Sequence, residues 1–232
     1  MQIGILTTGH APDALRPDYG DYPDLFQRLL GGQGFTFRNW NVVDMEFPDG
    51  PHDADGWLIT GSRHGAYEDH PFIPPLMDLI RAIHAAGVPL VGICFGHQII
   101  AQALGGKVEK YKGGWSVGRQ EYDFGGQRLA LNAWHQDQVV ALPPGATVCA
   151  SNDFCKNAAL VYDRRIFTVQ AHPEFGREFL ADMIEKRGRG FVPDQLLDAA
   201  KSQVDQPIDD ALMAARIGQF FRERVVPGMV PA

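Results

Sequence analysis

The chain has 232 residues, of which 45% are hydrophobic and 21% are charged, and no apolar run reaches the roughly 18 residues that a membrane span needs. Its 21 Lys and Arg residues stand against 28 Asp and Glu residues, so the formal charge is −7 and a nucleic-acid partner is not expected. This length suits one α/β domain, and no linker rich in Gly, Ser or Pro divides residues 1–232, so we expect a single soluble domain.

Apolar runs and helical patterns alternate in the first half of the chain. Short apolar runs predict four buried strands, at residues 2–8, 35–44, 55–60 and 88–94. Apolar residues at helical spacing, closed by glycine, predict three helices, at residues 22–34, 74–87 and 96–106. Strands and helices that alternate in this way predict right-handed βαβ units and a parallel sheet covered on both faces.

Short runs joined by turns replace this alternation in the second half. They predict strands at residues 107–124, 126–140, 146–152, 158–163 and 165–175, with a hairpin at the DRR stretch, residues 163–165. Amphipathic stretches then predict helices at residues 175–188, 192–203 and 207–225. The predicted fold is an α/β, three-layer, flavodoxin-like sandwich with a mostly parallel central sheet, an added antiparallel β portion and a C-terminal helical extension at about residues 190–232.

The cysteine count indicates the redox compartment. Cys94, Cys149 and Cys155 are too few and too irregularly spaced for a disulfide framework, and none forms a zinc-type pair. The N-terminal stretch MQIGILTTGH lacks the basic flank, the long apolar core and the cleavage site of a signal peptide. We therefore expect a cytoplasmic protein without a metal site.

Cys94 lies in the stretch VGICFGHQII, where a strand pattern passes into a helical one. Gly92 and Gly96 flank it in a G-x-C-x-G frame, which is typical of a sharp strand-to-helix turn that pushes the central side chain out of the sheet. The free amides and the positive dipole end of the following helix favour a thiolate there. The alternative is that Cys94 only fills the core, as free cysteines often do.

A histidine and a glutamate follow another apolar run, in the stretch TVQAHPEF. His172 and Glu174 should emerge where that strand ends, and residues two apart in an extended segment point the same way. Glu174 can then hold one ring nitrogen of His172 while the other faces Cys94, which is the logic of a catalytic triad. Exposed His-Pro-Glu turns are common, so this stretch indicates a catalytic pair only in combination with the Cys94 turn.

Acyl transfer also needs amide donors aimed at the developing oxyanion. Phe95 offers its backbone N–H, because it is the residue after the candidate nucleophile. Gly61 or Ser62, in the strand-ending stretch TGSRHG, offers a second N–H. An ordinary glycine turn is the alternative interpretation of that stretch.

With these pieces in order, the sequence resembles the class I (triad) glutamine amidotransferase family. The resemblance covers about residues 40 to 180, and its motifs follow the family's order: WLITGS, GICFGHQIIAQALGGKVEK, GWSVG, WHQDQV and QAHPEF. It is strongest to freestanding members similar to γ-glutamyl peptidases and hydrolases and to the glutaminase domain of GMP synthase. The TGSRHGAYED loop departs from the family by having less glycine and proline, which leaves the donating amide undecided.

The resemblance implies a nucleophilic Cys94, a His172 that acts as base and then as acid, an orienting Glu174, and oxyanion donors near Gly61 and Phe95. It also implies a pocket for the α-amino and α-carboxylate ends of a glutamyl group, lined by Gln98, Trp134, His135, Gln136 and Asp137. No cofactor and no metal is implied.

Simpler roles compete for some of these residues. Gln98 lies one helical turn after Cys94 and can face the same cavity, but it could equally be a solvated helix position. His135 could be an exposed loop residue, and His97 is expected to be structural. Four further residues are either contacts for the leaving group or surface and packing residues: Arg63, His64, Tyr67 and Trp115.

The leading functional hypothesis is hydrolysis of the γ-glutamyl amide bond of glutamine or of another small γ-glutamyl compound, through a glutamyl thioester. A second hypothesis makes the chain a glutaminase subunit that supplies ammonia to a separate synthase partner, since no synthase module is present in this sequence. A third is a non-enzymatic binding or redox-sensing protein with an oxidisable thiol. A sensor, however, has no need of His172, Glu174 or an oxyanion loop.

Overall fold

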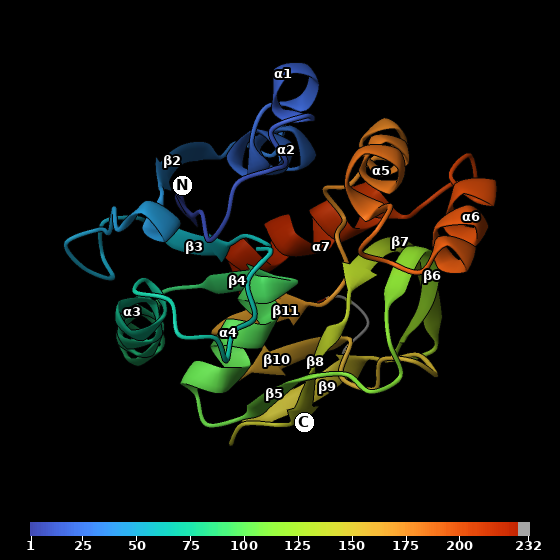
Figure 1. Cartoon of the computed structure of the whole chain (residues 1–232). Coiled ribbons are helices and arrows are strands. Elements are labelled where there is room, and N and C mark those ends of the chain that lie inside the picture. The colour runs from blue at the N-terminus through green and yellow to red at the C-terminus, as the bar shows by residue number, and fades with distance from the viewer. Residues whose placement is uncertain (227–232) are drawn as a thin grey trace.

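A seven-stranded sheet with the order β2-β1-β3-β4-β11-β10-β9 lies at the centre of the computed structural model, which describes residues 1–226 (Figure 1). Its strands are β1 (Gln2–Leu6), β2 (Thr36–Trp40), β3 (Gly56–Ile59), β4 (Leu90–Ile93), β9 (Ala146–Ala150), β10 (Ala159–Tyr162) and β11 (Ile166–Val169). The five strands from β2 to β11 run parallel, whereas β10 is antiparallel to both of its neighbours. The predicted mostly parallel central sheet is confirmed.

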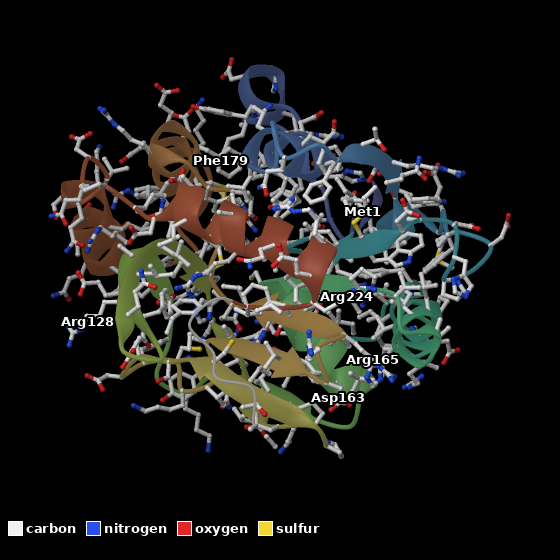
Figure 2. All side chains as sticks on the ribbon, turned by 180° about the vertical axis from the view of Figure 1, so that it is seen from behind. Met1, Arg128, Asp163, Arg165, Phe179 and Arg224 are labelled. Carbon is white, nitrogen blue, oxygen red and sulfur yellow. The ribbon has the colours of Figure 1, made fainter. Side chains whose placement is uncertain are left out.

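Helices cover both faces of this sheet. They are α1 (Arg16–Tyr19), α2 (Tyr22–Leu29), α3 (Ile73–Ala86), α4 (Phe95–Ala103), α5 (Arg177–Met183), α6 (Asp194–Ser202) and α7 (Asp210–Glu223), together with the 3-10 turn η1 (Val42–Asp44) and the π-helix η2 (Ile184–Gly188). Successive strand residues point to opposite faces, so Leu58 packs with α2 and α7 while Trp57 packs with α3 and α4. Figure 2 shows α7 lying across the face opposite to that of Figure 1. The three predicted layers are therefore present, and α7 belongs to the core.

Two small antiparallel sheets form the predicted extra β portion. One pairs β5 (Lys107–Lys110) with β8 (Asp137–Ala141), and the other pairs β6 (Ser116–Phe124) with β7 (Gln127–His135). Only Gln136 separates β7 from β8, so the chain passes from one small sheet to the other at that residue. On β6, Val117 is buried against Ile184 of η2 and Leu197 of α6.

Several details differ from the sequence-based prediction, and one is that the strand expected at residues 165–175 ends at Val169, before His172. The strand expected at residues 35–44 ends at Trp40, because the chain turns into η1 and buries Val42 in the core. Each of the strands expected at residues 107–124 and 126–140 is two strands, which belong to different small sheets. The short helix α1 forms between residues 9 and 21, where the sequence analysis predicted neither a helix nor a strand.

The hairpin predicted at residues 163–165 is confirmed. β10 and β11 pair in antiparallel register, with Tyr162 opposite Ile166. Asp163 and Arg164 have φ values of 44° and 57°, and two successive residues with positive φ are what a tight hairpin turn requires. Within residues 1–226, none of the helices has the length and apolar character needed to cross a bilayer. Part of the C-terminal extension, residues 227–232, lies outside the described residues.

Candidate active site

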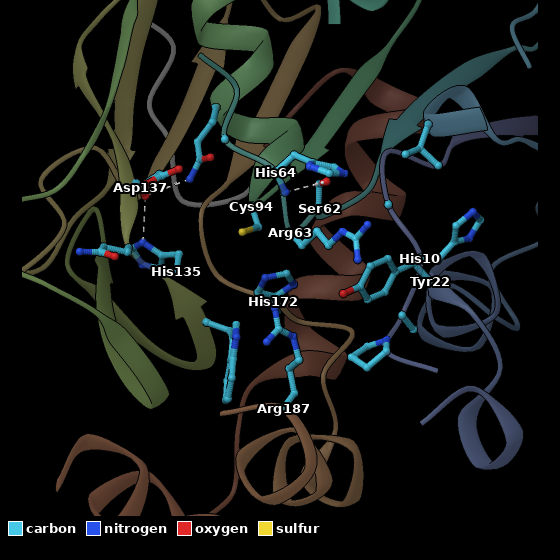
Figure 3. A pocket seen from close by; sticks show the side chains of 18 of the residues that line it. His10, Tyr22, Ser62, Arg63, His64, Cys94, His135, Asp137, His172 and Arg187 are labelled. Atoms are coloured by element: carbon cyan, nitrogen blue, oxygen red, sulfur yellow. Dashed lines mark hydrogen bonds between the residues drawn. The ribbon is translucent and has the colours of Figure 1, made fainter. Parts of the chain in front are cut away.

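The backbone at Cys94 makes a strained turn between β4 and α4. Cys94 has φ 52° and ψ −100°, a conformation that side-chain-bearing residues rarely adopt. Hydrogen bonds hold it there, because the Cys94 N–H donates to the carbonyl of Val169 (2.9 Å) and its carbonyl accepts from the N–H of Gln98 (3.1 Å). Cys94 thus caps α4, and Figure 3 shows its sulfur facing the ring of His172 across the cavity.

Gly92 and Gly96 allow close packing at this turn. A Cβ atom on Gly92 would lie 2.6 Å from the carbonyl carbon of Gly96, and one on Gly96 would lie 2.4 Å from the carbonyl oxygen of Ile59. Neither contact is possible for a larger residue without backbone movement. The two glycines let α4 start directly against the sheet, as the G-x-C-x-G frame predicts.

His172 and Glu174 emerge from the neighbouring strand. β4 and β11 are parallel neighbours with Ile93 opposite Val169, so the residues that follow each strand meet at the same edge. His172 Nδ1 lies 2.6 Å from Glu174 Oε1, and both side chains are buried. The N–H of His172 donates to the carbonyl of Asn132 (2.8 Å), which ties the segment to β7.

The charge state of His172 follows from these neighbours. Burial alone would lower its pKa, but the Glu174 carboxylate and the Cys94 sulfur, through charge and hydrogen bonding, raise the pKa well above its ordinary value of 6.5. The protonated imidazolium form is therefore stabilised between the carboxylate and the sulfur.

Packing fixes the plane of the His172 ring. The ring of Phe175 stacks on it with a centroid distance of 4.0 Å and an interplanar angle of 8°. Gly61 lies so close that a Cβ atom there would be 2.8 Å from His172 Cε1 and 3.8 Å from the Cβ of Cys94. Glycine at position 61 is thus required by the closeness of the loop to both side chains.

The predicted oxyanion donors belong to the two segments next to His172, since Phe95 follows Cys94, and Gly61 and Ser62 lie on the loop after β3. Within residues 1–226, the backbone N–H groups of Gly61, Ser62 and Phe95 donate to no acceptor of the protein. The Ser62 hydroxyl donates to the carbonyl of Thr8 (2.7 Å), which anchors the loop after β3. Free N–H groups at a buried site are rare, so these three are available to a ligand.

A cavity of about 710 Å³ opens in front of Cys94 and His172. All of the predicted substrate-pocket residues line it: Gln98, Trp134, His135, Gln136 and Asp137. The four residues with undecided roles also line it: Arg63, His64, Tyr67 and Trp115. Glu174 lies behind His172, where it lines a separate hollow of about 400 Å³.

The side chain of Gln98 is held inside the protein. Its Nε2 donates to the carbonyl of Asp137 (2.9 Å) and to Oε1 of Gln170 (3.1 Å), and the residue is only 3% exposed. Gln98 is therefore not a solvated helix position. Its amide ties α4 to the start of β8 at the cavity wall.

His135 is buried, and it is neutral. Burial and the charge of His172 lower its pKa to about 4, although a hydrogen bond to the Asp137 carbonyl acts in the opposite direction. Because a carbonyl only accepts, Nδ1 of His135 carries the proton in that 3.1 Å bond, which leaves a lone pair on Nε2. Nε2 is buried without a partner among the described residues, so it can accept a hydrogen bond from a ligand.

Several residues of this site were not identified from the sequence. Gln170 Nε2 lies 3.6 Å from the sulfur of Cys94, and Phe175 and Asn132 hold His172 in place. The pairing of Ile93 with Val169 identifies Gln170, since Cys94 and Gln170 are the residues that directly follow these two paired strand ends. His97, by contrast, points into the core, where its Nδ1 lies 2.8 Å from the hydroxyl of Thr168.

One group of donor atoms among residues 1–226 could hold a metal ion. His64, Glu68 and His70 each present a ligand atom, and these atoms lie within 4.8 Å of one another on the loop after β3. In the structure they satisfy one another instead, with His70 Nε2 2.8 Å from Glu68 Oε2. The chemistry available at Cys94 and His172 does not depend on this group.

Comparison with known proteins gives a consistent result. The family model for glutamine amidotransferase class-I matches residues 39–186, which is more than half of the chain. The chain is 30% identical to γ-glutamyl peptidase 4 of Arabidopsis thaliana, over 89% of each protein. It is 32% identical to one subunit of the glutamine-hydrolysing GMP synthase of Halobacterium salinarum, over 68% of this chain and 85% of that one.

A solved structure also matches along the whole chain. The crystal structure of a glutamine amidotransferase from Methylobacillus flagellatus has a TM-score of 0.75, with 21% sequence identity over 100% of this chain and 96% of the other. At that identity the likeness establishes the fold alone. The family model, together with the relatives that are at least 30% identical, establishes more: the chain belongs to the class-I glutamine amidotransferase family.

Proposed function

We propose that the chain hydrolyses γ-glutamyl amide bonds, with Cys94 as nucleophile, His172 as acid and base, and Glu174 as the group that orients His172. One observation carries the proposal: His172 is bound to Glu174 through Nδ1 at 2.6 Å, and its ring faces the sulfur of Cys94 at the wall of a cavity (Figure 3). The similarity to γ-glutamyl peptidases supports the same reaction class.

In the first half of the reaction the Cys94 sulfur, as thiolate, attacks the side-chain carbonyl carbon of the glutamyl group and forms a C–S bond. The imidazolium of His172 gives its proton to the amide nitrogen as the C–N bond breaks, which releases ammonia or an amine. The raised pKa of His172 supports this step, because the group starts the reaction protonated. A glutamyl thioester and a neutral His172 remain.

In the second half a water molecule adds to the thioester carbon. His172 takes a proton from that water, the C–S bond breaks, and glutamate leaves with the new C–O bond. Cys94 returns to the thiolate and His172 to the imidazolium, so the cycle closes without a net change in the protein. In both halves the N–H groups of Phe95 and of Gly61 or Ser62 stabilise the oxyanion.

The glutamyl group itself binds between α4 and the junction of β7 and β8. Trp134, Gln136 and Asp137 line that part of the cavity with Gln98 and His135. The lone pair on His135 Nε2 can accept a hydrogen bond from the α-ammonium group, and the Asp137 carboxylate supplies opposite charge. Tyr67 donates its hydroxyl proton to Asp137 at 3.2 Å, which helps to position that carboxylate.

A second candidate function is that of a glutaminase subunit. The similarity to the GMP synthase of Halobacterium salinarum favours it, since the matching subunit covers 68% of this chain. In that case the same chemistry would release ammonia for a separate synthase. Weak activity of the isolated chain and strong stimulation by a co-purifying synthase would identify this role, whereas full activity in isolation favours the freestanding hydrolase.

The test is hydrolysis of glutamine and of γ-glutamyl anilide by the wild type and by Cys94→Ala. The variant should lose at least about 10³-fold in kcat while it keeps the wild-type circular dichroism spectrum. Cys149→Ala is the matched control, because Cys149 is buried outside the cavity and burial raises its pKa to about 12. Turnover by Cys94→Ala at the wild-type rate would refute the proposal, and sulfenate formation at Cys94 without any hydrolysis would favour the redox sensor.

A further inference from the structure

Two arginines enter the cavity from different elements. Arg63 lies on the loop after β3, and Arg187 lies on the π-helix η2. Figure 3 shows Arg187 reaching toward His172, and it shows the side chain of Arg63 extending to the side of Cys94 on which Tyr22 is drawn. Two positive charges therefore lie next to the place where an amide bond would be cleaved.

Neither guanidinium has an anionic partner within residues 1–226. The neighbours of Arg187 in sequence do: Lys186 pairs with Asp182 at 2.9 Å, and Arg189 pairs with Asp194 at 2.9 Å. Arg187 is half-buried, and its guanidinium carbon lies 4.1 Å from the ring centroid of Phe191. A half-buried guanidinium without a counter-charge is unfavourable unless a ligand supplies the anion.

The carboxylates of the cavity are already engaged elsewhere. Asp44 lies 2.9 Å from His10, Glu68 lies 2.8 Å from His70, and Asp13 pairs with Arg16. Asp137 accepts the Tyr67 hydroxyl and also lies close enough to Lys110 for that charge to act on it. Within residues 1–226, three cations therefore line the cavity without an ion pair: Lys110, whose charge acts on Asp137, the exposed Arg63 and the half-buried Arg187.

The backbone around Arg187 is shaped to reach the cavity. A π-helical turn is wider than an α-helical turn and is frequent at functional sites. The last residue of η2 is Gly188, where a Cβ atom would lie 2.7 Å from Leu197 and 3.0 Å from the ring of Trp134. Glycine at this position lets η2 pack directly on Trp134, which brings Arg187 to the cavity wall.

Arg63 lies on the side of Cys94 opposite to His135 and Asp137, whereas Arg187 approaches His172 from η2, next to Trp134. In Figure 3, His135 and Asp137 lie on one side of Cys94 and His172, and Tyr22 and His10 lie on the other with Arg63. A glutamyl group bound near His135 would place its scissile carbonyl at Cys94. The leaving amine then extends toward Arg63 and Arg187.

We propose that Arg63 and Arg187 bind a carboxylate carried by the leaving amine. The substrates that fit are γ-glutamyl amino acids and γ-glutamyl peptides with a free carboxylate close to the scissile bond, in preference to glutamine and to γ-glutamyl derivatives of simple amines. Guanidinium groups suit this role because their N–H pairs match the two carboxylate oxygens. This inference rests on the proposed hydrolysis.

The test compares γ-glutamylglycine with γ-glutamylglycinamide, which differ only in the terminal carboxylate. A charge-assisted hydrogen bond contributes roughly ten- to hundredfold in affinity, so wild-type kcat/KM should favour γ-glutamylglycine by about tenfold or more. Arg187→Gln and Arg63→Gln should each bring this ratio close to one. Lys186→Gln removes a neighbouring positive charge outside the cavity and should keep the wild-type ratio.

A binding measurement separates this inference from the proposed function. Titration of Cys94→Ala with each compound should give tighter binding of γ-glutamylglycine, and adding Arg187→Gln should abolish that difference. The arginine site alone is overturned if proteins that keep both arginines hydrolyse or bind γ-glutamylglycine and γ-glutamylglycinamide equally well. It is also overturned if the preference for γ-glutamylglycine survives both arginine substitutions. Clear binding of γ-glutamylglycine without hydrolysis of any γ-glutamyl compound would instead overturn the proposed reaction and keep the site.

Discussion

The side-chain amide of Gln170 donates to the sulfur of Cys94 across 3.6 Å. The same amide accepts, through Oε1, from Gln98, which in turn donates to the carbonyl of Asp137. A continuous series of hydrogen bonds thus connects the sulfur with the wall of the proposed glutamyl pocket. Gln170 is fully buried, so water does not compete for these bonds.

Replacing Gln170 with methionine should lower kcat/KM by about tenfold, because the sulfur loses a donor that orients it. The rate of Cys94 alkylation by iodoacetamide should change as well, which a purely structural role would not cause. Gln138→Met is the matched control, since Gln138 is also buried and donates to a backbone carbonyl, that of Phe154, outside the cavity. Wild-type kinetics and alkylation in Gln170→Met would remove Gln170 from the site.

Adding one methyl group at Gly61 should inactivate the protein without unfolding it. The new Cβ atom would lie 2.8 Å from His172 Cε1, so the ring must move, and a shift of about 1 Å at a reacting group can cost about 10²-fold in rate. The free energy of unfolding should fall by only about 1–3 kcal/mol. Gly50→Ala, where nothing lies within 4 Å of the new atom, should match the wild type in both steady-state kinetics and urea unfolding.

The pairing of His172 with Glu174 makes a pH-dependent contribution to stability. Because the folded-state pKa of His172 is raised, the folded protein keeps a proton that the unfolded chain releases above pH 6.5. The stabilisation is therefore fully present below pH 6.5 and is lost as the pH rises through the folded-state pKa. In Glu174→Gln, His172 remains buried but has lost the neighbouring carboxylate charge, so the pKa of His172 falls. The decrease in stability with rising pH should then disappear.

Urea unfolding at several values between pH 6.5 and pH 9.5 measures this effect as the difference between Glu174→Gln and the wild type. The stability gap between the two proteins should narrow as the pH rises. Glu178→Gln, an exposed substitution in α5, should give a gap that does not change with pH. A constant gap for Glu174→Gln would contradict the assignment.

Two buried histidines predict sensitivity to acid. Burial lowers the pKa of His97 to about 3 and that of His135 to about 4, so both are neutral in the folded protein and take up protons on unfolding below pH 6.5. Each should cost about 1.4 kcal/mol of stability per pH unit as the pH falls from 6.5 toward 4. His97→Asn should reduce the pH dependence of the free energy of unfolding, measured in urea, by about the contribution of one histidine.

Much of the site was predictable from local sequence because its chemistry depends on local turns. Gly92 and Gly96 indicated the turn at Cys94, and the contacts a Cβ atom would make at both positions give the physical reason. The apolar run before His172 indicated a strand end, and the structure places His172 after β11. The central sheet was predictable for a similar reason, since its inner strands are buried on both faces and are almost entirely apolar.

The remaining features depend on contacts between distant segments. Gln170 belongs to an apolar run in the sequence, and only the pairing of β11 with β4 brings it to Cys94. Arg187 lies in a stretch that has an ordinary helical pattern, and the π-helical turn that directs it into the cavity depends on packing against Trp134. Val42 is another example, because the sequence predicted it within a strand, whereas in the structure it lies after β2 and packs in a core cluster.

The place of β11 in the sheet has a consequence for protein synthesis. β11 lies between β4 and β10, yet the ribosome makes it after the two small sheets are complete. Under the proposed mechanism, a nascent chain that ends before β11 carries the Cys94 thiol but has no base to serve it, and the sheet centre is still open. Under that mechanism, reactivity would arise late in translation, when the insertion of one strand brings His172 to Cys94.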